Sequence, residues 1–127
     1  MKQFMSALIL ALACGSAMAL AHELTPTYPE FKPSYVRDIS VTTMEMFNAR
    51  EEIEFYRVDV YTENWDPIPF ATGQRVIRIQ HRERYTFNVF IRDSDLDKVE
   101  YICTTSMIEE GSIDSQGISS RVCSRIK

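Results

Sequence analysis

Several residue patterns on which common functions depend are absent or scarce in this chain. It holds two histidines, His22 and His81, and no nucleophile flanked by glycines, so hydrolytic catalysis has no support. Acidic side chains outnumber basic ones by 18 to 14, and this balance gives no electrostatic reason to bind nucleic acid or an anionic membrane. Beyond the first residues, no apolar run approaches membrane-spanning length. We therefore expect no enzyme, no cofactor, no nucleic-acid partner and no transmembrane segment in the mature chain.

The first 21 residues have the pattern of a secretory signal. Lys2 precedes the apolar run 4–13, and small residues follow that run. The run is too short to cross a bilayer, and we expect cleavage after Ala21, where the polar chain begins. A membrane anchor and lipid attachment at Cys14 are the alternatives. Cleavage predicts a periplasmic or extracellular protein and leaves residues 22–127, which have the size of one domain with a modest core.

Two cysteines, Cys103 and Cys123, remain after this cleavage. An exported chain enters an oxidising space, where a disulfide between them is the expected state. Closing such a loop stabilises a fold by roughly 3 kcal/mol. A metal site is the weaker alternative, because no histidine lies near either cysteine and their separation is not that of a zinc site.

Apolar and β-branched residues recur at every second position through most of residues 37–127, and turn residues separate the runs. This pattern predicts a single all-β domain, either a sandwich or a barrel. Residues 44–54 also fit a helix, but their neighbours are strands, so we expect a strand followed by a turn. The preceding segment 22–36 contains three prolines and is expected to be extended. The expected strands are 41–47, 55–61, 75–80, 84–92, 99–105 and 118–126.

The last two expected strands are suited to form a hairpin. If Cys103 lies opposite Cys123, Ile113 falls at the middle of the connection 109–117 (EEGSIDSQG). This connection is polar and contains two glycines, so the register and the turn chemistry agree. Directly opposed side chains at a closely spaced pair lie near disulfide range.

Two resemblances refine the fold. Asp97, Tyr101 and Cys103 have the spacing of the tyrosine corner in immunoglobulin-like sandwiches, which implies such a sandwich over residues 37–127. Almost the whole mature chain resembles the N-terminal domain of the periplasmic chaperones that assist pilus assembly. The resemblance is carried by the strand end 44–48 (MEMFN), by Pro69-Phe70, and by the closing residues 124–127 (SRIK).

The resemblance implies a binding function. In that family the closing strand is an edge donated to a partner subunit, and a basic pair holds the partner's C-terminal carboxylate. It implies a chaperone-like module that binds a protein subunit, fibre-like or pilus-like, by edge-strand addition. The positions that match the donated face and the basic pair are Ile118, Ser120, Val122, Ser124, Ile126, Lys127 and Lys32. One branch of the family also joins its last two strands by a disulfide.

Two other functions are compatible with the same fold. A structural component of a surface or particle needs the sandwich without strand donation. A copper site would use an N-terminal His22, exposed by cleavage after Ala21, together with His81. The arginines around His81 disfavour a bound cation there, so the copper site is the weakest of the three hypotheses.

Overall fold

The computed structural model describes residues 21–107 and 120–126, and the described chain forms eight strands and one short 3-10 helix. The strands are β1 (Glu23–Thr25), β2 (Lys32–Pro33), β3 (Ile39–Phe47), β4 (Phe55–Tyr61), β5 (Val76–Arg78), β6 (Arg84–Arg92), β7 (Tyr101–Met107) and β8 (Arg121–Arg125). The helix η1 (Asp93–Lys98) connects β6 to β7. No helix among these residues is long and apolar enough to cross a membrane.

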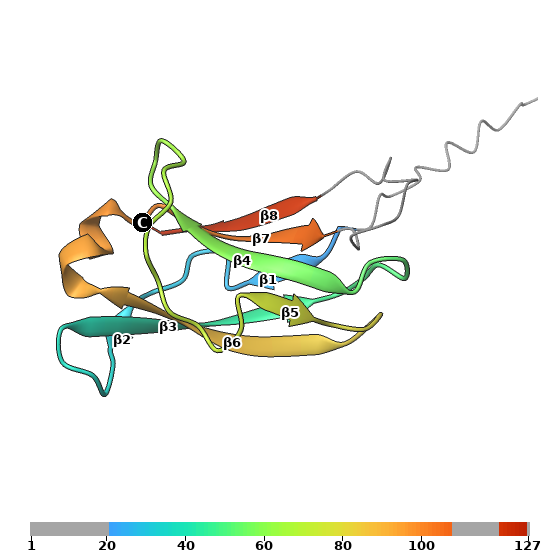
Figure 1. Cartoon of the computed structure of the whole chain (residues 1–127), viewed down its shortest axis with the longest axis horizontal. Coiled ribbons are helices and arrows are strands. Elements are labelled where there is room, and N and C mark those ends of the chain that lie inside the picture. The colour runs from blue at the N-terminus through green and yellow to red at the C-terminus, as the bar shows by residue number, and fades with distance from the viewer. Residues whose placement is uncertain (1–20, 108–119, 127) are drawn as a thin grey trace, which may run out of the picture.

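The strands form two antiparallel sheets that pack against each other (Figure 1). In the first, sheet A, β6 pairs with β3 along its whole length, while β1 and β2 pair with the two ends of β3 on its other side. In the second, sheet B, the order is β5, β4, β7, β8. The predicted all-β sandwich is confirmed, and β8 is an edge strand of sheet B.

Alternate side chains of the two sheets fill the space between them. Met44 and Met46 of β3 and Tyr56 and Val58 of β4 are all fully buried in one cluster. Because neighbours in a strand point to opposite faces, this alternation confirms a strand at residues 44–47 and not a helix. The same cluster includes Leu24, Val60, Ile77, Val89, Ile91 and Ile102.

A buried amide organises the end of β3. The side chain of Asn48 is fully buried, and its Nδ2 donates to the carbonyl oxygens of Ile53 and Ile79, each at 2.7 Å. The hydroxyl of Tyr56 donates to Asn48 Oδ1. Asn48 therefore joins the end of β3 to the segment before β4, at Ile53, and to the segment after β5, at Ile79.

Several element boundaries differ from the predicted ones. The strand predicted at 75–80 is reduced to Val76–Arg78, although Arg75 and Ile79 beside it still take part in backbone hydrogen bonds. The strand predicted at 99–105 begins later, because η1 runs to Lys98. In the predicted closing strand, residues 118 and 119 lie outside the described residues. The extended segment 22–36 contributes β1 and β2, which the sequence pattern did not resolve into strands.

Candidate binding edge

Strand β8 pairs with β7 in the predicted register. Cys103 lies opposite Cys123 with their Cα atoms 4.1 Å apart, and the two sulfur atoms are bonded at 2.02 Å. The backbone bonds that flank the strand run from Ser106 N to Ser120 O and from Ile126 N to Glu100 O. Even-numbered residues of this segment thus bond to β7, while the N–H and C=O groups of the odd-numbered residues point away from it.

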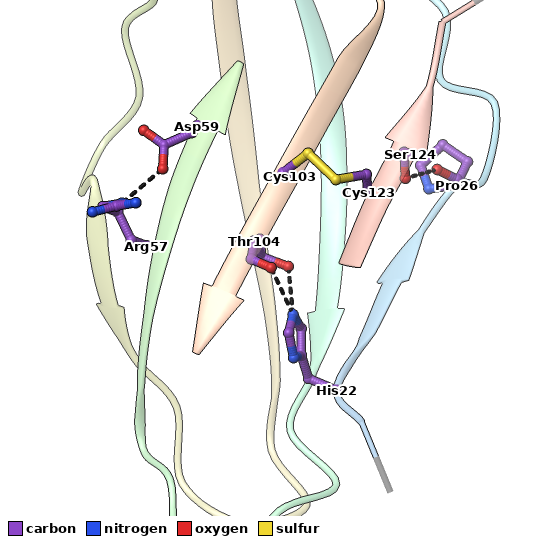
Figure 2. Close-up of a disulfide and its surroundings, with 8 residues drawn as sticks. All are labelled: His22, Pro26, Arg57, Asp59, Cys103, Thr104, Cys123 and Ser124. Atoms are coloured by element: carbon purple, nitrogen blue, oxygen red, sulfur yellow. Dashed lines mark hydrogen bonds and ion pairs between the residues drawn. A yellow bond between two sulfur atoms is a disulfide. The ribbon is translucent and has the colours of Figure 1, made fainter. Parts of the chain in front are cut away.

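One end of this outward side is occupied by the chain itself. The N–H of Arg125 donates to the carbonyl oxygen of Thr27 at 3.0 Å, and Ser124 Oγ donates to that of Pro26 at 2.7 Å (Figure 2). Further back along β8, no described strand pairs with the outward groups of Arg121 and Cys123. β1 lies beside β8 without pairing with it. We call the backbone of Arg121 and Cys123, with which no described strand pairs, the open part of the edge.

The predicted partner-binding side chains on β8 face the interior of the sandwich. Val122 and Ile126 are partly buried against the core cluster, Ser124 is 1% exposed, and Ser120 lies within 3.3 Å of a ring nitrogen of His22. Ile118 and Lys127 lie outside the described residues. Contact of a partner with these side chains would need access from the margin of the sandwich, and their assignment stays a prediction.

Lys32 lies on sheet A, exposed in β2 and paired with Val41. Its neighbour Phe31 lines a hollow of about 440 Å³ together with Tyr28, Leu96 and Ile126. The chain beside Lys32 and the end of β8 thus meet at the same end of the molecule. Nothing in the described residues joins Lys32 itself to β8.

His22 is buried, which the sequence did not indicate. The residue is 2% exposed, and its Nε2 lies 2.8 Å from Thr104 Oγ1 and 3.0 Å from the Thr104 carbonyl oxygen (Figure 2). The ring also packs against Tyr56, with centroids 4.6 Å apart. Burial lowers the pKa of His22, and the nearby Arg50 lowers it further, while the bond to Thr104 raises it.

The positions of His22 and His81 do not support the copper hypothesis. Both ring nitrogens of His22 have hydrogen-bond partners within the protein, and His81 is exposed in the turn between β5 and β6. No group of three or more potential metal ligands from His, Cys, Asp and Glu occurs within residues 21–107 and 120–126.

The outer face of sheet B carries an aromatic cluster that the sequence did not reveal. Trp65 is held in a turn with a positive φ of 66° and stacks flat on Tyr101, with ring centroids 4.3 Å apart. Tyr61 packs against the same indole at 5.7 Å. We call Tyr61, Trp65 and Tyr101 the aromatic stack. Arg121 of β8 lies over it, with its guanidinium carbon 5.4 Å from the centroid of Tyr61 and 5.6 Å from that of Trp65.

The disulfide lies on this same outer face. Cys103 is fully buried although it points away from the core. Along β4, the residue opposite it is Asp59, which pairs with Arg57 at 2.7 Å (Figure 2). Asp59 also pairs with Arg75 at 2.8 Å. Hydrogen bonding to Asp59 raises the pKa of Arg57. A disulfide between paired strands is typical of proteins in an oxidising compartment.

Comparison with known proteins leaves the family open. No protein-family model matches the sequence, and no curated protein matches it significantly. Among solved structures, the chain is similar to a FixG-related protein from Vibrio parahaemolyticus, with 14% identity and a TM-score of 0.47. The similarity covers 83% of this chain and 94% of that one.

Proposed function

We propose that this protein is an exported, chaperone-like module that binds a partner polypeptide by adding its strand to the open edge of β8. The observation that carries the proposal is that no strand within residues 21–107 and 120–126 pairs with the outward side of β8 at Arg121 and Cys123. An edge strand presents unsatisfied N–H and C=O groups in a row, and these are what an added strand pairs with.

The attachment of β8 supports this role. A strand that pairs with a partner strand binds it best when its own position in the sheet is fixed. β8 is fixed to β7 by the disulfide, and its far end is held by the bonds to Pro26 and Thr27. The resemblance to pilus-assembly chaperones supports the same function, with a subunit of a surface fibre as partner and the periplasm as its location.

A proline substitution can block the edge without breaking the sheet. The N–H of Arg121 points away from β7, so Arg121→Pro removes a donor that the β7–β8 ladder does not use. Arg121→Ala removes the same side chain and keeps the N–H. We expect Arg121→Pro to bind its partner about tenfold more weakly than Arg121→Ala, since one hydrogen bond is lost and the ring obstructs the partner strand.

The disulfide-bonded chain is first used as bait to recover its partner protein from the envelope fraction of the cells that produce it. Affinities of the variants are compared by titration, and hydrogen exchange locates the protected amides, which we expect to be those of residues 121–125. Thr86→Pro is the control, because Thr86 lies on the other open margin, strand β6, with its N–H also directed outward. Equal affinities for Arg121→Pro and Arg121→Ala, or protection confined to another surface, would overturn the proposal.

A further inference from the structure

One margin of strand β6 has a stretch with which no described strand pairs. Phe90 exchanges both of its backbone bonds with Ala71, so the even-numbered residues of β6 point outward while the odd-numbered ones bond to β3. The outward N–H and C=O groups of Arg84, Thr86 and Asn88 have no partner strand among the described residues. Ala71 closes this stretch at one end, and the turn before β6 closes it at the other. We call the backbone of these three residues the β6 edge.

The β6 edge lacks the usual protection of an edge strand. β6 is nine residues long, contains no proline and pairs with β3 without a bulge. The charge of Arg84 is directed back over β3, because its guanidinium bonds to Glu45 at 2.9 Å and lies 4.8 Å from the ring centroid of Phe47. Asn88 is held toward β3 in the same way, by a bond from Thr43 at 2.7 Å. The side chains that could obstruct an added strand are therefore held away from the margin.

The β6 edge is complementary to itself. In an antiparallel pair of two copies with Thr86 opposite its own equivalent, Arg84 of each copy lies opposite Asn88 of the other. Every outward donor and acceptor of the edge then has a partner, and no like charges lie directly opposite. A shift of this register in one direction would bring an outward residue against Phe90, which is already bonded to Ala71. A shift in the other direction would bring one against the turn before β6. The open stretch thus has its centre at Thr86, as a two-fold interface requires.

The inward side chains of this stretch fit the same pairing. Tyr85 and Phe87 lie next to one another with ring centroids 6.4 Å apart, and Tyr85 is only partly buried against the core. In the register centred on Thr86, Tyr85 of one copy lies opposite Phe87 of the other, and aromatic cross-strand pairs are favourable. The turn before β6 bends toward β3, since Arg82 N–H donates to the carbonyl oxygen of Asn48 at 2.7 Å. The turn therefore does not extend along the margin of the second copy.

We infer that two copies of this chain associate by antiparallel pairing of their β6 edges about a two-fold axis at Thr86, which joins sheet A of one copy to sheet A of the other. β8 lies on the opposite margin of the sandwich, because β1, which is beside it, is separated from β6 by β3. The inference goes beyond the proposed function and does not depend on it. The dimer leaves the open part of both β8 edges available to partner strands.

Sedimentation equilibrium of the disulfide-bonded protein tests the inference. We expect the mass to rise with concentration toward twice that of one chain. Thr86→Pro removes the outward N–H at the centre of the edge, so it should weaken association about tenfold relative to Thr86→Ala, which keeps that N–H. Arg121→Pro, on the other margin, should leave association unchanged. A single-chain mass at every concentration, equal association of the two Thr86 variants, or a dimer that only Arg121→Pro disrupts would overturn the inference.

Charged variants of Thr86 test the register without a proline. Thr86 is exposed, so Thr86→Asp and Thr86→Lys place a charge at the axis without burying it in the single chain. Like charges directly opposite should weaken each variant's own dimer about fivefold, and a mixture of the two variants should associate as well as the wild type, because opposite charges then meet. Hydrogen exchange should show protection of residues 84–88 that increases with protein concentration. If the mixture associates no better than either variant alone, the inference is wrong and the proposed function is unaffected.

Discussion

At the scale of single residues, His22 makes the fold sensitive to pH. Its imidazole is buried against Tyr56 and Thr104, and Arg50 is the charged group that acts on it; no carboxylate of the described residues bonds to the ring. Because its pKa in the folded protein is lowered, the unfolded chain takes up the proton first as the pH falls. The contribution of His22 to stability is thus complete above pH about 6.5 and declines as the pH drops below that value.

We expect the free energy of unfolding to fall between pH 7.5 and pH 5, and to fall less in His22→Gln, which cannot titrate. Urea denaturation of both proteins at the two pH values measures the effect. His81→Gln is the control, since it replaces a histidine at an exposed position by the same residue. Identical pH profiles for the wild type and His22→Gln would contradict the burial of a neutral imidazole.

Asn48 is a second residue on which the fold depends. Asn48→Ala would leave the carbonyl oxygens of Ile53 and Ile79 without their donor, and both lie in the buried region around this amide. We expect a loss of about 3 kcal/mol, because buried polar groups without partners are costly. Tyr56→Phe removes one bond of the same group and should cost about 1 kcal/mol. Thermal or urea unfolding compares the two, and the prediction fails if Asn48→Ala is the milder change.

At the scale of secondary-structure elements, the disulfide secures β8. Replacing both Cys103 and Cys123 by serine should lower the free energy of unfolding by about 3 kcal/mol, because the denatured chain regains the freedom of a 20-residue separation. Hydrogen exchange should show faster opening of β8 and unchanged protection in β3 and β6. Uniform loss of protection across both sheets would show that β8 does not open as a separate unit.

The elements differ in how far the sequence specifies them. Strands β3, β4 and β6 could be predicted, because each buries one face and so alternates apolar with polar residues along its length. The β7–β8 register could be predicted because one cysteine pair fixes every other pair. β1 and β2 could not, since they are three and two residues long and lie in a proline-rich segment without alternation.

At the scale of the whole molecule, the candidate site depends on contacts that a local pattern does not contain. Arg121 reaches Tyr61, which is two strands away in sheet B, and His22 packs against Thr104, which is 82 residues away. Alternation along β8 correctly separates inward from outward side chains. It does not indicate that Pro26 and Thr27 cover one end of the strand, or that a stacked tryptophan lies beneath Arg121.

The contact of Ser124 with Pro26 also has a consequence for how the chain folds. It joins residues 98 positions apart, so the sandwich cannot close until nearly the whole polypeptide has emerged. Folds dominated by such distant pairings form slowly, because the entropy of a large loop is lost before the contact is gained. During synthesis, β1 can pair with β3 early, but its attachment to the closing strand through Pro26 and Ser124 forms only at the end.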